Sequence, residues 1–178
     1  MGKMRILRAI VLISLPLLAV RTPVHAQRAA STADDGAKRR AVQLAAVRAV
    51  MRQPHRDTLA ATCVSLAGPA GTTRRVEPDS AFLAALQAPG HGPVVPLGRC
   101  PPTYEIGERV GPNPPPRPPG ALDPYHVAIR RLTLLRGGRA RVQVWEDRGA
   151  GTTRYACTAT PAAGTWSATC RVTYIAIF

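Results

Sequence analysis

The sequence is poor in three kinds of residue, and each shortage excludes a class of protein. Only 10 of the 178 residues are acidic, and 4% are aromatic. Lysine occurs only at Lys3 and Lys38, so arginine carries nearly all the positive charge. No apolar run reaches the roughly 20 residues of a membrane-spanning helix. Basic segments interleaved with aromatics are missing, as are helix-turn-helix, zinc-finger and RNP motifs, so we do not expect a nucleic-acid-binding protein.

The N-terminus has the three parts of a secretory signal peptide. Three basic residues lie within the first eight positions, and residues 9–20 are uncharged and mostly apolar. Residues 24–26, Val-His-Ala, provide the small residues that signal peptidase accepts. The sequence therefore predicts cleavage after Ala26 and a mature protein in the periplasm or outside the cell. A buried N-terminal helix is the alternative.

The formal net charge of +14 indicates an acidic partner. The first 26 residues contain four basic residues and no acid, so the mature chain keeps +10. An anionic component of the cell envelope or a small ligand fits this charge. The arginines are scattered along the chain, however, and the arginine usage of a GC-rich genome is the better explanation of that pattern.

Four cysteines remain in the mature chain: Cys63, Cys100, Cys157 and Cys170. An even number of cysteines in an exported chain predicts two disulfides. No CxxC pair or Cys/His cluster with zinc spacing occurs, so we expect neither a metal site nor a cofactor. If both bridges form, no free thiol is left for nucleophilic catalysis.

A hairpin predicts how the cysteines pair. If the chain turns at Ala163–Gly164, Cys157 lies directly opposite Cys170 in a non-hydrogen-bonded pair, where the Cβ atoms are closest. By elimination, Cys63 pairs with Cys100. Strand alternation then places six residues on the core face of this hairpin: Tyr155, Cys157, Trp166, Cys170, Val172 and Tyr174.

Apolar residues at helical spacing predict two helices. The first covers residues 37–53, is capped by Asp34 or Asp35 and ends before Pro54. The second is short and covers residues 81–87. Residues 27–36 are expected to form a flexible N-terminal tail.

The remaining segments predict strands. They cover residues 58–66, a brief piece from Val94 that leads to Cys100, and an antiparallel meander over residues 126–135, 139–147, 152–160 and 165–178, with glycine-containing turns between its strands. Residues 101–124 are rich in proline and are expected to form a surface loop.

These elements predict one α+β domain over residues 37–178, in which the helices pack on a curved antiparallel sheet ending in the meander. The order of elements resembles the cystatin-like and NTF2-like folds. The pattern Tyr155-x-Cys157, Gly164-x-Trp166 and Cys170 is similar to one in small exported bacterial proteins of unassigned function. Cystatin inhibitors use a Gln-x-Val-x-Gly loop, which the nearest segment, Gln143–Trp145, lacks.

Two functions follow as hypotheses. The first is a non-catalytic exported domain that binds a ligand or an envelope component. The second is a small enzyme with an NTF2-like pocket, in which Asp123 and His126 perform acid/base chemistry, as pocket His and Asp residues do in such enzymes. An ordinary hydrogen-bonded pair of Asp123 and His126 is the alternative to catalysis.

Overall fold

The computed structural model describes residues 24–54, 56, 59–68, 74–101, 122–149 and 151–177, with side chains from residue 34 onward. The expected signal region before residue 24 and residues 102–121 of the proline-rich loop lie outside this part. The elements follow in the order α1 (Val24–Met51), β1 (Thr62–Ala67), β2 (Arg75–Val76), α2 (Ser80–Leu86), β3 (Val94–Pro96), the 3-10 turn η1 (Leu97–Arg99), β4 (Tyr125–Leu135), β5 (Arg139–Arg148), β6 (Gly151–Ala162) and β7 (Thr165–Ile177).

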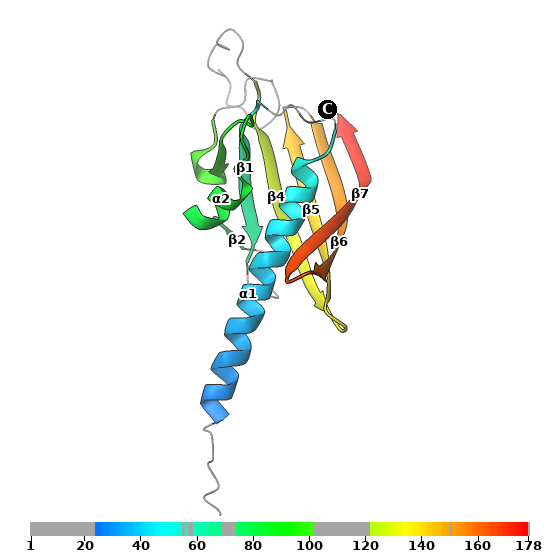
Figure 1. The fold of residues 1–178 in the computed structure, drawn as a ribbon. Coiled ribbons are helices and arrows are strands. Elements are labelled where there is room, and N and C mark those ends of the chain that lie inside the picture. The colour runs from blue at the N-terminus through cyan, green and yellow to red at the C-terminus, as the bar shows by residue number, and fades with distance from the viewer. Residues whose placement is uncertain are drawn as a thin grey trace, which may run out of the picture.

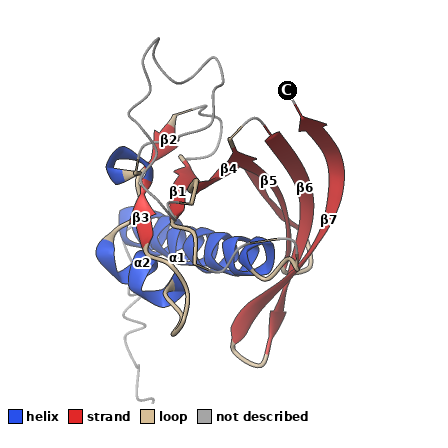
Figure 2. Ribbon diagram, turned by 90° about the horizontal axis from the view of Figure 1, so that it is seen from above, coloured by secondary structure: helices blue, strands red, loops and turns tan. Residues whose placement is uncertain are grey.

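A curved sheet wraps around α1, and α2 lies beside α1 near β1 and β3 (Figures 1 and 2). The strand order is β2-β1-β4-β5-β6-β7, and β3 pairs with β1. The α+β class is therefore confirmed. Within the described residues, no helix is long and apolar enough to cross a membrane.

The prediction of an entirely antiparallel sheet is wrong, because β1 runs parallel to both β3 and β4. After β1 the chain passes through β2 and α2, and β3 then starts at the same edge of the sheet at which β1 started. β3 therefore runs in the same direction as β1, and β4, which starts at that edge too, does the same. Strand periodicity alone does not reveal such a crossover, so the mixed sheet could not be predicted from it.

The meander of β4 to β7 matches the prediction in order, direction and turns. Ala163 and Gly164 both have positive φ, at 46° and 77°, as a two-residue hairpin turn requires. Ala162 faces Thr165, and Cys157 faces Cys170 with a Cα–Cα distance of 4.0 Å. The cysteines are joined in the two predicted pairs, Cys157–Cys170 and Cys63–Cys100.

A bulge in β7 corrects the predicted position of Tyr174. Tyr155 pairs with Val172 and Arg154 pairs with Tyr174, so Thr173 is an extra residue in β7. The inserted residue reverses the alternation of side chains beyond it. Tyr174 consequently lies on the same face as Arg154 and not on the core face.

Helix α1 is longer than the sequence predicts, because it begins at Val24 and not near residue 37. The predicted tail, residues 27–36, is helical, and its first turns extend beyond the sheet (Figure 1). Residues 24–36 include four alanines and no proline, a composition that favours helix. Asp34 therefore lies inside the helix and does not cap it, and its carboxylate pairs with Lys38 one turn later.

The core lies between α1 and the concave face of the sheet. We call this concave face the inner face and the opposite, convex face the outer face. Val42, Val47 and Val50 of α1 are fully buried and pack against inner-face residues such as Ile129, Val142 and Val144. The disulfide Cys157–Cys170 also lies on the inner face, beside α1.

Candidate functional site

The outer face of β4–β7 carries a cluster of arginine side chains. By register, and for Arg130 by its contact with Trp145, six arginines lie on this face, against a single acidic residue, Asp147. The six are Arg130, Arg131, Arg139, Arg141, Arg154 and Arg171. Such an excess of one sign gives the face a strongly positive potential.

Arginines and aromatic rings alternate across the middle of the outer face. The guanidinium carbons of Arg130 and Arg154 lie 4.3 Å and 4.2 Å from the centre of the Trp145 ring. Arg154 also lies 4.5 Å from the centre of the Tyr174 ring. These cation–π contacts connect β4, β5, β6 and β7 in one row. The bulge in β7 is what brings Tyr174 into this row.

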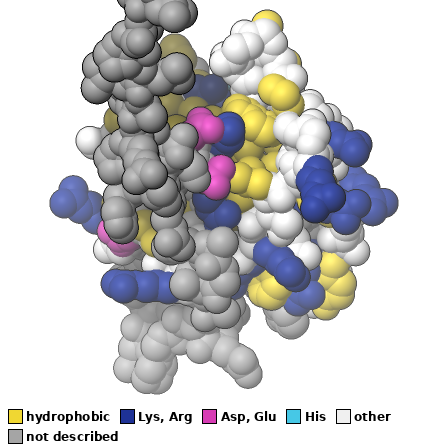
Figure 3. Space-filling model, turned by 90° about the horizontal axis from the view of Figure 1, so that it is seen from below, with side chains coloured by type: hydrophobic (Ala, Val, Ile, Leu, Met, Phe, Trp, Pro, Cys, Tyr) yellow, Lys and Arg dark blue, Asp and Glu magenta, His cyan; other side chains and the backbone are white. Residues whose placement is uncertain are grey.

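Exposed arginines flank this row toward the hairpin ends of the strands. None of Arg131, Arg141 and Arg171 makes an ion pair within the described part of the chain. Seen from below, dark-blue side chains lie on the right flank with no magenta side chain in view among them, whereas in the middle and on the left dark-blue and magenta side chains lie together (Figure 3). The charge of these arginines is therefore available to a partner.

Several acidic residues are committed to contacts elsewhere. Asp79 caps α2 by accepting a hydrogen bond of 2.8 Å from the Phe82 N–H, and it pairs with Arg40 of α1. The hydrogen bond from Arg40 lowers the pKa of Asp79 to about 2. Glu77 accepts a hydrogen bond from the Gly98 N–H. These residues hold helices and turns together and do not neutralise the outer face.

The inner face holds a buried ion pair between Arg56 and Glu146, whose side chains are each 4% exposed. Arg56 donates to Thr62 at 3.0 Å and lies 3.9 Å from the centre of the Tyr125 ring. Burial lowers the pKa of Arg56, and the charge of Glu146 opposes this shift. Burial also raises the pKa of the Tyr155 hydroxyl, which donates to Glu146.

This ion pair is absent from the sequence-based predictions, although the sequence contains one signal for it. Glu146 continues the inward series Ala140, Val142 and Val144 in a strand whose other face is polar. A carboxylate in that register must be buried, and a buried carboxylate needs a cationic partner. The partner could not be identified from the sequence, because Arg56 is 90 residues away.

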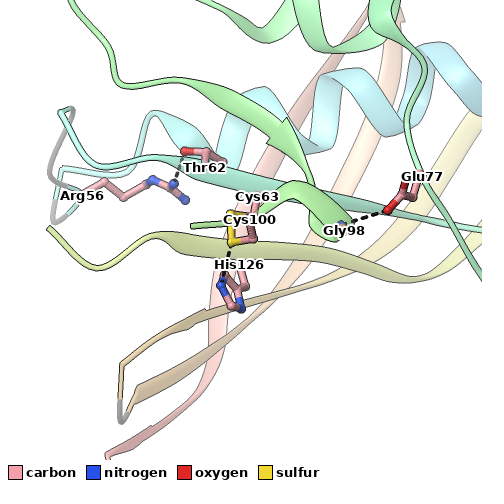
Figure 4. Close-up of a disulfide and its surroundings, with 7 residues drawn as sticks. All are labelled: Arg56, Thr62, Cys63, Glu77, Gly98, Cys100 and His126. Atoms are coloured by element: carbon pink, nitrogen blue, oxygen red, sulfur yellow. Dashed lines mark hydrogen bonds between the residues drawn. A yellow bond between two sulfur atoms is a disulfide. The ribbon is translucent and has the colours of Figure 1, made fainter. Parts of the chain in front are cut away.

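The Cys63–Cys100 disulfide lies close to this ion pair along the strands, next to His126 (Figure 4). Cys63 of β1 pairs in register with His126 of β4, which places both side chains on the outer face. The Nε2 atom of His126 is 3.0 Å from the Sγ atom of Cys100. The two disulfides are therefore on opposite faces of the sheet.

Asp123 and His126, the predicted acid/base pair, lie in different environments: Asp123 is buried, and His126 is partly exposed beside the disulfide. Asp123 precedes β4 and is 1% exposed. His126 is partly exposed and contacts the disulfide, while its neighbour Tyr125 points to the inner face and receives a hydrogen bond from Arg148. The contact between His126 and the disulfide could not be predicted from the sequence, because Cys63, Cys100 and His126 are far apart along the chain.

No known family model matches the chain, and comparison with curated proteins and with solved structures found no match.

Proposed function

We propose that this protein is an exported, non-catalytic binding domain whose outer sheet face binds an anionic polymer of the cell envelope. Two observations support export. The N-terminal sequence has the order of a cleavable signal, and the described residues contain two disulfides, which persist in oxidising compartments. Cleavage after Ala26 would remove the first three residues of α1.

The observation that carries the binding function is the set of six arginines on one face of a rigid sheet. Guanidinium groups form paired hydrogen bonds with phosphate and carboxylate groups. Neighbouring strands are about 4.8 Å apart, and alternate residues along a strand are about 7 Å apart. The arginines are therefore spread over four neighbouring strands, and an extended polyanion contacts several of them at once.

The curvature of the sheet favours a polymer over a small ligand. Small-molecule sites are concave and enclose most of their ligand. The outer face is the convex side of the sheet (Figure 2), so it offers no enclosure but a broad contact surface. Trp145 and Tyr174 add flat surfaces among these arginines, and each contacts a guanidinium that is oriented by the ring.

Charge reversal at matched positions tests this function. The outer-face variant combines Arg131→Glu, Arg141→Glu and Arg171→Glu. The control combines Arg52→Glu, Arg74→Glu and Arg99→Glu, which are exposed residues outside the outer face and change the net charge equally. Polyphosphate and polygalacturonate serve as phosphate and carboxylate probes, and affinity is measured by titration calorimetry at two salt concentrations.

We expect the wild-type affinity to fall as salt rises, because exposed charges are screened. At about 1 kcal/mol for each lost contact, the outer-face variant should bind at least about a hundredfold more weakly. The control should stay within about fivefold of wild type. Equal losses in both variants would contradict the proposal, as would binding of vesicles of anionic lipid in preference to both polymers. Recovery of the protein from the cytosol with residues 1–26 intact would contradict export.

A further inference from the structure

Among the described residues, one group of metal-binding side chains converges closely enough to hold an ion: Cys63, Cys100 and His126. The two Sγ atoms and one imidazole nitrogen all lie within 4.8 Å of one another. A tetrahedral zinc ion with Zn–S distances of about 2.3 Å and Zn–N distances of about 2.0 Å holds its ligands about 3.5 Å apart. The His126 Nε2 atom, 3.0 Å from the Cys100 Sγ atom, is near this separation, whereas the two sulfurs are bonded to each other and must move apart once the bridge is reduced.

We propose that reduction of the Cys63–Cys100 disulfide converts this group into a redox-dependent Cys2His site for Zn²⁺. Thiolates bind zinc whereas a disulfide does not, so the oxidised protein has no such site. A dithiol reductant transfers two electrons and two protons to the bridge and becomes a disulfide itself. Each Cys thiol then loses its proton to solvent as its sulfur binds the ion, and water completes the four ligands.

Three separate segments of the chain, β1, the residue after η1 and β4, supply the three ligands. Cys63 is fully buried near the start of β1, and His126 is its partner in the parallel strand β4. Cys100 follows η1, and the hydrogen bond from the Gly98 N–H to Glu77, 2.9 Å long, fixes this turn (Figure 4). A Cβ atom at residue 98 would crowd the Glu77 carboxylate, so a larger residue there would make the glutamate side chain shift.

The second disulfide provides an internal control. Cys157 and Cys170 lie on the inner face, where the Cys170 Sγ atom is 4.0 Å from the Ala46 carbonyl. The metal-ligand group that the described residues contain does not include either cysteine. Reduction of this second bridge therefore yields at most two ligands. The inference does not depend on the proposed polymer binding, because it uses different residues.

Titration with Co²⁺, a spectroscopic substitute for Zn²⁺, tests the proposal on the mature protein. We compare the oxidised protein, the protein reduced with a phosphine, and two reduced variants, His126→Ala and the double variant Cys157→Ala/Cys170→Ala. The reduced wild type and the cysteine variant should bind one equivalent of Co²⁺ with a sulfur-to-cobalt charge-transfer band that Zn²⁺ abolishes. The oxidised protein should show no such band.

Loss of a direct ligand should weaken binding in His126→Ala at least about tenfold, since even indirect metal contacts have effects of this size. Thermal unfolding gives a second readout: Zn²⁺ should raise the midpoint of the reduced wild type more than that of His126→Ala, because metal binding stabilises the folded state. Equal Co²⁺ affinity in wild type and His126→Ala, or no thiolate band in the reduced protein, would overturn the proposal. If reduction unfolds the chain and Zn²⁺ fails to restore the fold, the proposal is equally overturned.

Discussion

The two faces of β5 show how the same strand supports stability on one side and recognition on the other. Val142, Val144 and Glu146 point inward, and all are nearly or fully buried. Arg141 and Trp145 alternate with them and point outward. The inner-face carboxylate of this strand, Glu146, is paired with Arg56, whereas six outer-face arginines are opposed by one acid. A charge in the core must be compensated within the protein, but an exposed charge need not be, and only the exposed arginines remain available to a partner.

The largest expected effect comes from breaking the inner-face pair. Glu146→Gln leaves the buried Arg56 without its counter-charge and should lower the free energy of unfolding by about 3–5 kcal/mol. Asp147→Asn, at the adjacent outer-face position, keeps an acceptor for the Thr152 hydroxyl and should lower it by less than about 1 kcal/mol. Urea unfolding measures both variants.

The double variant Arg56→Met/Glu146→Leu sharpens this test. It removes both charges together, so it should recover most of the stability that Glu146→Gln loses. Equal losses in Glu146→Gln and Asp147→Asn would show that the two faces tolerate charge equally, contrary to the comparison.

The outer-face and inner-face disulfides should also differ in how much each contributes to the free energy of unfolding. Cys63 and Cys100 are 37 residues apart, and Cys157 and Cys170 are 13 apart. In the loop-entropy model, replacing each pair by alanine should lower the free energy of unfolding by about 4 kcal/mol for the outer-face bridge and about 3 kcal/mol for the inner-face bridge. Urea unfolding under oxidising conditions measures this order. The reverse order would mean that packing around the inner-face bridge outweighs loop closure.

Substitutions at two adjacent residues of β5, Val144 and Trp145, should distinguish an effect on stability from an effect on binding. Val144→Ala deletes two buried methyl groups and should lower the free energy of unfolding by about 2 kcal/mol while leaving polyphosphate affinity unchanged. Trp145→Ala removes two cation–π contacts, worth about 1–2 kcal/mol in total, and should also weaken polyphosphate binding. Calorimetric titration of the two folded variants checks this difference. If Val144→Ala weakens binding as much as Trp145→Ala, the outer face is not the binding surface.

The meander could be predicted from the sequence because its information is local. Alternation and short turns fixed the register from Ala163–Gly164 outward to the Cys157–Cys170 pair. The prediction failed at Tyr174, because one inserted residue, Thr173, changes the face of every side chain beyond it. Likewise, the helical spacing near Leu44 and Val50 located α1, but its start was wrong because Asp34 offered a plausible cap.

The candidate sites depend on contacts between distant segments, which explains why the sequence did not show them. The parallel pairing of β1 with β4 brings His126 to Cys63, and the loop after α1 brings Arg56 to Glu146. The positive charge was visible in the composition, but the scattered arginines gather on one face only once the strands pair in register. The charge excess therefore predicted a partner without locating its binding surface.

The smallest expected effect concerns Asp79, an acid that is paired at the surface and not in the core. Its pKa is lowered to about 2 by Arg40, so its pairing stabilises the folded state above the usual aspartate pKa of 3.8 and is lost as pH falls toward 2. Asp79→Asn keeps a cap for α2 but loses the charge, and Asp79→Ala loses both. Thermal unfolding from pH 5 to pH 2 should therefore show a weaker loss of stability on acidification in both variants than in wild type. At pH 5, the alanine variant should be the least stable of the three, and identical pH profiles in all three proteins would show that the Arg40 pairing contributes nothing measurable.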